Sequence, residues 1–374
     1  MIQVYYPILF VVGIYFFIIS LANHYEMWRF TLDAEMADGP LVSVLVPARN
    51  EESCIARCIL SLCNQYYQNY EILVLNDNST DSTLPILEQL AAENRRLKVI
   101  NGAPLPGGWY GKPFALHQLA KEAKGEILLF TDADTIHSPT SISWAVTNIT
   151  GLKADMISGY IGQKMNTLGE IVTVPLMFLL TGFVIPLFLN RFTKLHFFSS
   201  AIGQYIAIRR EVLNAIGGCE SFKKKTSEDI YMSRHVKRMG YQTRFLDITA
   251  HAWCRMYNGY NEALQGIGKN IFDFFAKNSL LLFFVALVAS FFFFFPFPLL
   301  FISIITKSPH LGIVILVNIL YTLTWIFMFL GHRLEWYYGL LWPLLWLNFL
   351  RVASYSWFRT VSGKGFLWKD RVVS

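Results

Sequence analysis

Long apolar runs flank a central stretch in which short apolar segments alternate with mixed ones. Residues 4–21 form an uninterrupted apolar run that is long enough to cross a bilayer as one helix. Four more apolar runs follow, at residues 171–189, 280–305, 311–330 and 336–358. The last three are long enough to span, and Trp and Tyr side chains lie near their expected interfaces. The pattern predicts a membrane anchor in residues 1–25 and a C-terminal transmembrane region in residues 279–358.

We interpret residues 40–275 as an α/β domain with a mainly parallel sheet. Apolar segments at residues 41–46, 71–75, 97–100 and 126–130 have the length and composition of buried strands. Helices are expected at residues 51–64, 82–93 and 113–123. Near-continuous apolar strands that alternate with helices are typical of a parallel sheet covered on both faces. Such sheets bind ligands beyond the carboxyl ends of their strands.

The composition supports the membrane assignment and excludes one class of partner. Hydrophobic residues make up 54% of the chain and charged residues 16%, whereas soluble domains carry about 25% charge. The net charge of +6 suits contact with anionic headgroups, and it also fits the ordinary excess of Lys and Arg in cytosolic segments. No block of basic and aromatic residues indicates nucleic-acid binding. The five cysteines contain no C-x-x-C pair, which fits a reducing compartment.

Two polar motifs follow the first two predicted strands. Residues 47–52 read PARNEE and lead into a helix whose first backbone N–H groups could meet a nucleotide. Residues 76–81 read NDNSTD, and Asp77 could accept hydrogen bonds from a base or a ribose. Ordinary turn and helix-cap chemistry also explains each motif when it is taken alone, with Asp81 as a cap residue.

Carboxylates form the other two motifs. Asp132 and Asp134 follow the strand at residues 126–130, and two carboxylates one residue apart suit a hard cation such as Mg²⁺ or Mn²⁺. Glu228 and Asp229 open a predicted helix that extends to about residue 238. Asp229 could act there as a general base, although acids at a helix start also interact favourably with the helix dipole.

Taken in order, the four motifs resemble the family 2 glycosyltransferases of GT-A fold, over residues 42–269. Residues 104–112, PLPGGWYGK, resemble a narrower subgroup of membrane enzymes that glycosylate carotenoids and similar lipids and are related to ceramide glucosyltransferases. Residues 255–257 (RMY) and 368–371 (WKDR) fit the same subgroup. The expected fold is therefore a GT-A domain with N-terminal and C-terminal transmembrane helices.

The resemblance implies roles for individual residues. Asp132 and Asp134 would hold the metal diphosphate, and Asp229, with Glu228 beside it, would be the base of an inverting displacement. The residues implied to hold the nucleotide are Pro47, Arg49, Glu51 and Asp77.

Two lysines are further candidates for contact with the donor's phosphates. Lys112 could reach a phosphate if the glycine-rich loop at residues 107–111 closes over the donor, and a mobile surface loop is the alternative. Related processive and ceramide enzymes carry Gln-x-x-Arg-Trp after the base, whereas residues 265–269 here read QGIGK. Lys269 is therefore only a candidate for contact with the diphosphate, and the departure argues against polysaccharide synthesis.

The apolar run at residues 171–189 separates Asp134 from Asp229 in the sequence. If this run crossed the bilayer, the two carboxylates would lie on opposite sides and could not form one site. We therefore predict that it lies in the interface or re-enters without crossing. Pro175 and Pro186 fit such a broken segment.

The expected location is a bacterial cell membrane, as a multi-pass protein with its catalytic domain in the cytosol. Arg29 is the first basic residue after the first apolar run and favours the cytosolic side. The basic tail, residues 359–374, also favours that side, whereas three C-terminal spans would place it outside. The sequence leaves this conflict open.

The leading hypothesis is a metal-dependent hexosyltransferase that moves a sugar from a UDP-sugar to a lipid hydroxyl. A carotenoid, hopanoid, sphingolipid or glycerolipid is the expected acceptor. A second hypothesis is transfer to polyprenyl phosphate, an acceptor that is already an anion and needs no base. A third is a membrane scaffold or transport component without catalysis, and the intact carboxylates argue against it.

Overall fold

The structure is a computed structural model of the chain, and it describes residues 2–225, 227–275, 277–368 and 371–373. The chain forms two compact units. The first, here called the sheet unit, contains residues 26–164 and 187–255. The second, the helical unit, contains residues 1–25, 165–186 and 256–374.

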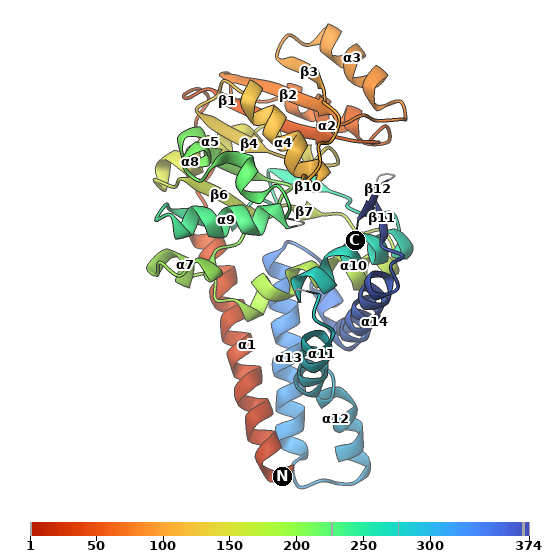
Figure 1. The fold of residues 1–374 in the computed structure, drawn as a ribbon. Helices are drawn as coiled ribbons and strands as arrows, with labels where there is room; N and C mark the ends of the chain where they lie inside the picture. Colours follow the sequence, from red (N-terminus) through yellow and green to blue (C-terminus); the bar gives the residue numbers. More distant parts are fainter. Residues whose placement is uncertain (1, 226, 276, 369–370, 374) are drawn as a thin grey trace. The chain divides into compact units, whose positions relative to one another are not determined.

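A seven-stranded sheet forms the centre of the sheet unit, with strand order β3-β2-β1-β4-β8-β6-β9 (Figure 1). The strands are β1 (Val42–Ala48), β2 (Tyr70–Asn76), β3 (Leu97–Asn101), β4 (Ile127–Phe130), β6 (Met156–Tyr160), β8 (Ile206–Arg209) and β9 (Thr243–Asp247). β1 pairs in parallel with β2 and β4, β2 with β3, and β6 with β9. Only β8 is reversed within this sheet, because it runs antiparallel to both β4 and β6. The predicted strands and the mainly parallel sheet are confirmed.

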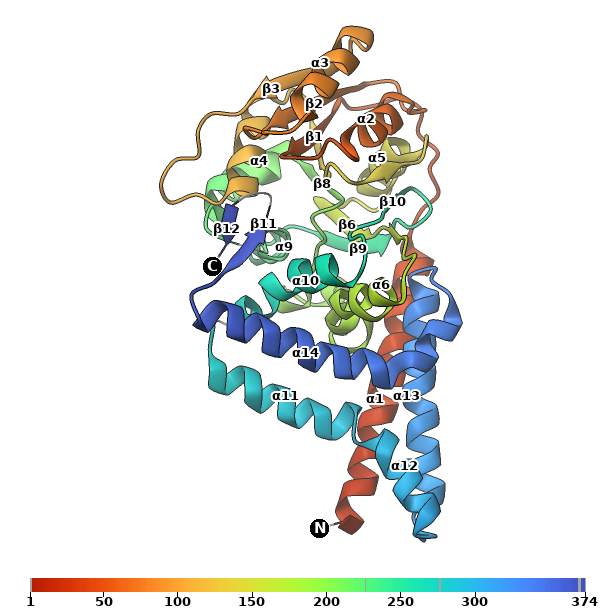
Figure 2. The ribbon, with the colours of Figure 1, turned by 90° about the vertical axis from the view of Figure 1, so that its right-hand side faces the viewer.

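Helices cover both faces of this sheet (Figures 1 and 2). One face carries α2 (Ile55–Cys63), α3 (Thr83–Glu93) and α5 (Ser141–Gly151), and the other carries α4 (Gly111–Glu122), α8 (Arg210–Ala215) and α9 (Glu228–Arg238). The predicted helices form, but α2 begins four residues later than expected, at Ile55, and α4 begins two residues earlier, at Gly111. Pro113 favours this start, because the first turn of a helix needs no backbone donor from proline. Lys112 therefore lies in the first turn of α4 and not in a loop.

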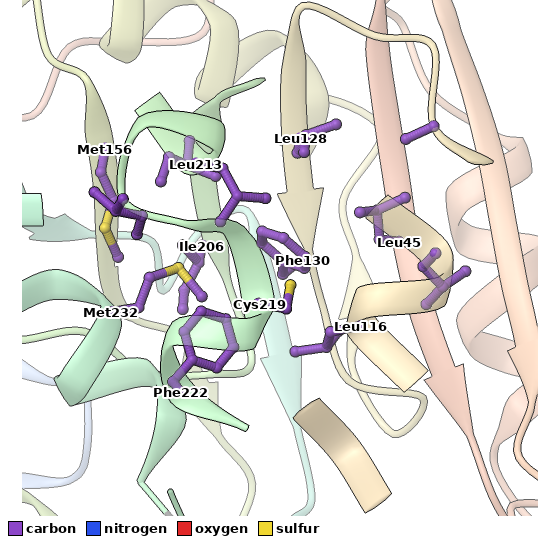
Figure 3. Packing of buried hydrophobic residues seen from close by; sticks show 14 of the residues in the cluster. Leu45, Leu116, Leu128, Phe130, Met156, Ile206, Leu213, Cys219, Phe222 and Met232 are labelled. Carbon is purple, nitrogen blue, oxygen red and sulfur yellow. The ribbon is translucent and has the colours of Figure 1, made fainter. Parts of the chain in front are cut away.

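One apolar core lies between the sheet and the helices α4 and α9 (Figure 3). Phe130 of β4 and Ile206 of β8 contribute to it from the sheet, and Leu116 of α4 and Met232 of α9 contribute from the helices. These four side chains are at most 3% exposed, and complete burial of each such side chain stabilises the fold by about 1.5–3 kcal/mol. The shared core therefore fixes the first turns of α4 and α9 on the same face of the sheet.

Two helices of the described residues are long and apolar enough to cross a membrane. The first comprises residues Tyr5–Phe30 of α1 (Ile2–Phe30), whose last turns belong to the sheet unit. The second is α13 (Leu311–Gly331), in the helical unit. These two helices confirm the expectation of apolar helices in both terminal regions.

The other two predicted C-terminal spans take a different form. The run at 280–305 is divided into α11 (Ser279–Phe293) and α12 (Pro296–Ile305), and Pro296 lacks the backbone donor that a continuous helix would need. The run at 336–358 forms a 3₁₀ turn (Trp336–Leu341) and α14 (Trp342–Val361), which carries Arg351 and Arg359. Figure 2 shows α11 and α14 running across α13 instead of along it. Neither run forms one long apolar helix, and whether these segments cross the membrane stays a prediction.

The run at residues 171–189 is broken into short helical pieces. These are α6 (Leu168–Thr173), a 3₁₀ helix (Val174–Phe178), a π-helix (Leu180–Val184) and α7 (Leu189–Phe192). None of these pieces is long enough to cross a bilayer. Whether the segment lies at the membrane interface stays a prediction.

The fold makes a specific demand at Gly159, which pairs with Leu246 between β6 and β9. A Cβ atom at position 159 would lie 1.8 Å from the carbonyl oxygen of Leu246. We expect Gly159→Ala to destabilise the protein by about 1–3 kcal/mol or more, because the two strands must separate. Thermal unfolding in detergent measures this effect. Gly107→Ala is the control, since no atom lies within 4 Å of its Cβ position, and equal midpoints for both variants would contradict the expectation.

Candidate active site

The candidate site lies where β1, β2 and β4 end. β1 pairs in parallel with both neighbours, so the three carboxyl ends meet at one edge of the sheet. The PARNEE, NDNSTD and TDAD motifs all lie at this edge, because each begins at or directly after one of these strands. The helix starts that carry Lys112 and Glu228 reach the same edge from the face covered by α4 and α9.

Arg49 joins the loops that follow β1 and β2. Its Nη1 donates to the carbonyl oxygens of Asp77, at 2.6 Å, and of Asn78, at 3.1 Å. The Asp77 N–H donates to the carbonyl of Ala48 at 2.8 Å, and Asp77 is 6% exposed. The structure therefore brings Arg49 and Asp77 together, next to Pro47 in β1.

Glu51 is held beside the same loops. Its N–H donates to Thr83 Oγ1 at 2.8 Å, and its Oε2 lies 3.1 Å from the thiol sulfur of Cys54. The Thr83 N–H donates to Asp81 at 3.0 Å, so Asp81 contributes to the start of α3. These contacts show a well-connected pair of loops, and the nucleotide-binding roles of these residues stay a prediction.

Lys112 connects the elements that carry the acidic motifs. Its Nζ lies 2.7 Å from Asp132 Oδ1 and 3.0 Å from Glu228 Oε1. Burial lowers the pKa of Lys112, but the two carboxylates outweigh this effect and hold the pKa well above its ordinary value. Lys112 therefore remains charged, and it compensates acids that are nearly 100 residues apart in the sequence.

Asp229 lies beside this ion pair. Its Oδ2 accepts a hydrogen bond from the Gly203 N–H at 2.9 Å, and its Oδ1 accepts one from the Ile230 N–H at 2.7 Å. Burial and the negative charge of Glu228 raise the pKa of Asp229 to about 6, although Lys112 and the two backbone donors oppose the rise. A carboxylate with this pKa can take up a proton near neutral pH.

Lys112, Asp132, Gly203 and Glu228 line a cavity of about 10 Å³, which has room for roughly one water molecule. Its wall also includes the apolar side chain of Phe130, whereas the side chains of Lys112 and Asp132 are 34% and 28% exposed. Electrostatic interactions at such a partly exposed site are stronger than in bulk water but weaker than in a dry interior.

The two aspartates of the TDAD motif have the chemistry of a partial metal site. Both are partly buried, and carboxylate oxygens are the ligands that Mg²⁺ and Mn²⁺ prefer. Among the described residues, no group of three or more His, Cys, Asp or Glu side chains is placed to hold a metal ion. A cation at Asp132 and Asp134 would therefore take its remaining ligands from a bound phosphate and water, which is how Mg²⁺ is commonly held.

Buried neutral groups lie next to the TDAD motif. Thr131 Oγ1 contacts His137 Nε2 at 3.0 Å and donates to the Gln204 carbonyl at 3.0 Å. Burial lowers the pKa of His137 to about 3, so its ring is neutral. Burial raises the pKa of Cys58 well above its ordinary value, and Asp134 and Asp132 raise it further. These groups add no charge to the site.

Gly203 is a contributor that the sequence motifs did not indicate. It precedes β8 and donates its N–H to Asp229, and a Cβ atom there would lie 2.9 Å from Lys112 Nζ. Its only signal in the sequence is a run of small residues before an apolar strand, which does not show what the run approaches. Lys269 lies on α10 (Tyr260–Phe274) in the helical unit, so its contact with a diphosphate stays a prediction.

The glycine-rich loop before α4 is attached at its end. The Tyr110 N–H donates to the carbonyl of Lys223 at 2.8 Å, and Trp109 packs against the rings of Phe114 and His117. Gly108 has a φ of +86°, a value that favours glycine. Closure of this loop over a donor stays a prediction.

Residues 43–217 match the family model of glycosyl transferase family 2. The probable glycosyltransferase YdaM of Bacillus subtilis is 29% identical over 222 residues, which cover 58% of this chain and 50% of YdaM. The beta-monoglucosyldiacylglycerol synthase of a Nostoc species is 45% identical over 97 residues, which cover 25% of this chain and 20% of that enzyme. The chain thus matches half or less of the length of these relatives.

One solved structure shares the fold over most of its length. The mannosyltransferase PcManGT of Pyrobaculum calidifontis, solved with GDP-Man and Mn²⁺, superposes with a TM-score of 0.56 at 18% identity. The match covers 96% of this chain and 99% of that structure. The GT-A fold predicted from the motifs is confirmed.

The raised pKa of Asp229 has a consequence for stability. A carboxyl group whose pKa is higher in the folded state favours folding at low pH, and this contribution is lost as the pH rises through about 6. We therefore expect Asp229→Asn to stabilise the protein above pH 6, by up to about 3 kcal/mol, and to have little effect near pH 4. Thermal midpoints measured across this range test the sign. The exposed Glu88→Gln is the control, and a variant that is less stable than the wild type at pH 8 would contradict the expectation.

Proposed function

We propose that the chain transfers a hexose from a UDP-sugar to a hydroxyl group of a membrane lipid, because residues 43–217 match the family model of glycosyl transferase family 2. The observation that carries this proposal is the cluster of Lys112, Asp132, Glu228 and Asp229 at the carboxyl edge of the sheet. Transfer of a sugar to a hydroxyl group needs a cation, a carboxylate that can bind a metal and a carboxylate that can accept a proton. This cluster contains all three. In a scaffold protein nothing would require them to lie together.

The loops after β1 and β2 are the proposed binding site for the nucleotide. Arg49 holds the two loops together, which leaves Asp77 in a fixed position at the edge of the sheet. Asp132 and Asp134 are the proposed ligands of a divalent cation, which would neutralise the charge of the departing diphosphate. Lys112 adjoins Asp132, so its ammonium group is in reach of the same diphosphate.

Asp229 is the proposed general base. Its ionised carboxylate takes the proton from the acceptor hydroxyl while the hydroxyl oxygen forms a bond to the anomeric carbon. The bond from that carbon to the diphosphate breaks at the same time, and the configuration inverts. The Gly203 and Ile230 N–H groups hold the two carboxylate oxygens, which fixes the direction from which the acceptor approaches.

Two observations support a lipid acceptor. The described residues include two helices that are long and apolar enough to cross a membrane. The relative from Nostoc is named as a beta-monoglucosyldiacylglycerol synthase, so its acceptor class is a glycerolipid. The Pyrobaculum protein was solved with Mn²⁺, which makes this ion a reasonable choice for the first assay.

The test is to incubate membranes containing the protein with labelled UDP-sugars and Mn²⁺ and to identify the labelled lipid by mass spectrometry. We expect transfer that stops when EDTA removes the metal. Asp229→Asn should lower kcat by about 10²–10⁴-fold, because the acceptor hydroxyl loses its base. Glu88→Gln should retain full activity.

Two outcomes would contradict the proposal. A polyprenyl phosphate product formed equally fast by Asp229→Asn would identify an acceptor that needs no base. Failure of the wild-type protein to bind any nucleotide sugar in the presence of Mn²⁺ would exclude a glycosyltransferase function altogether.

The pH dependence gives a second test of Asp229 as the base. Activity should rise with pH through about 6, because the carboxylate must be ionised. Lys112 opposes the raised pKa of Asp229, so Lys112→Met should move this acidic limb to higher pH. The measurement is kcat at saturating donor as a function of pH. Lys121→Met, on the exposed side of the same helix, is the control, and an unchanged limb in Lys112→Met would contradict the assignment.

A further inference from the structure

Residues 192–197 of the sheet unit present an exposed aromatic surface that the proposed chemistry does not use. The side chains of Phe192, Leu195 and Phe197 are 68%, 50% and 47% exposed. Single exposed apolar side chains are common, but three within six residues concentrate apolar surface on one short segment, as interaction sites do. We call this segment the aromatic ledge.

Buried hydrogen bonds hold the ledge at both of its ends. Before it, the Asn190 side chain donates to the Thr243 carbonyl at 3.0 Å, and Lys237 Nζ donates to the Asn190 carbonyl at 2.7 Å. After it, the Ser199 hydroxyl contacts the hydroxyls of Ser233 and, at 2.9 Å, of Thr243. All five residues are buried. A polar network in an apolar interior is stable only when its members are paired, so the ledge is a built feature and not a loose loop.

This network connects the ledge to the proposed base. Lys237 and Ser233 belong to α9, whose first turn carries Glu228 and Asp229. The short helical turns of residues 189–198 pack against β9 and α9 (Figure 1). The ledge and α9 are therefore held to each other.

The ledge also adjoins the end of the long apolar helix α1. Arg191 lies 3.7 Å from the ring of Phe30 and 4.5 Å from the ring of Phe192, and it forms an ion pair with Glu26 at 3.2 Å. Phe30 is the last residue of α1. The ledge is thus attached at the level where the candidate span ends.

The residues around this helix end have the composition of a membrane–water interface. Trp28 is 63% exposed on the last turns of α1, and Arg29 follows it with an exposed side chain. Lys194 is exposed within the ledge itself. Aromatic rings at headgroup depth, with basic groups that contact anionic lipids, are typical of segments that lie in the interface.

We propose that the aromatic ledge and Trp28 insert into the headgroup layer of the bilayer, and that this contact sets the depth of α9 relative to the lipid. The consequence for Asp229, that it meets a hydroxyl at the membrane surface, rests on the proposed function. The contact with the bilayer itself does not.

Depth measurement tests the contact without any assay of activity. The full chain is placed in nanodiscs of phosphatidylcholine and phosphatidylglycerol, with a nitroxide attached through p-acetylphenylalanine in place of Phe197. This label leaves the five cysteines untouched. We expect collisions with oxygen to dominate over collisions with water-soluble nickel chelate. The control label replaces Leu60, which is 54% exposed on α2 of the same unit, and it should show the reverse.

Equal access of the nickel chelate to positions 197 and 60 would overturn the proposal. The proposal would also be overturned if the label at position 197 were protected only in nanodiscs that hold two copies of the protein and its spectrum showed dipolar broadening. That result would indicate self-association.

A second measurement links the ledge to catalysis. In vesicles, the double variant Phe192→Ser and Phe197→Ser should raise KM for the lipid acceptor by about tenfold, because both anchoring rings are lost. Binding of UDP and the thermal midpoint of the double variant should remain as in the wild type. The control Leu60→Ser should change none of these quantities, including KM for the lipid acceptor. A ledge that is protected in nanodiscs but has no effect on KM would overturn the catalytic link alone. If the ledge is protected in nanodiscs but the wild-type protein transfers no sugar, the result would count against the proposed function and not against the membrane contact.

Discussion

The ion pairs of Lys112 with Asp132 and Glu228 connect three elements that are distant in the sequence. Asp132 lies two residues after the end of β4, whereas Lys112 and Glu228 each lie in the first turn of a helix. Asp132 and Glu228 line a small, partly apolar cavity, and Asp229 follows Glu228 in the chain. Without the ammonium group, these three carboxylates would form a set of like charges. The geometry of the site therefore depends on one side chain, and the core shared by α4 and α9 keeps that side chain in place.

Two kinds of support surround this cluster. On one side, hydrogen bonds between the loops after β1 and β2 give the edge of the sheet a fixed shape. On the other side, the reversed strand β8 brings its preceding turn, with Gly203, against Asp229. An all-parallel sheet would need a long crossover before such a strand, and the turn would then enter the sheet at the opposite end. The antiparallel direction of β8 is thus what delivers a backbone donor to Asp229.

Local patterns were sufficient to predict the first four strands, the helices between them and the grouping of the acidic motifs. Such patterns depend on residues that are close in the sequence. A buried parallel strand, for example, has a short, nearly continuous apolar sequence that is easily recognised. The donor from Gly203 and the ion pairs of Lys112 could not be predicted, because they depend on which distant segments meet. Hydropathy also did not indicate that the run at residues 280–305 divides into two helices at Pro296, or that the run at 336–358 begins with a 3₁₀ turn before α14. Hydropathy counts apolar residues, but it does not register whether the backbone remains helical.

The short distance between positions 203 and 112 has a consequence for the evolution of the chain. A Cβ atom at residue 203 would lie 2.9 Å from Lys112 Nζ, so the glycine and the long basic side chain share one volume. A side chain at position 203 would therefore require the end of Lys112 to shift, although Nζ is the far end of a flexible side chain and can move. The two positions, 91 residues apart, are thus coupled through one small volume, so a bulkier residue at 203 has to be accommodated by the side chain at 112.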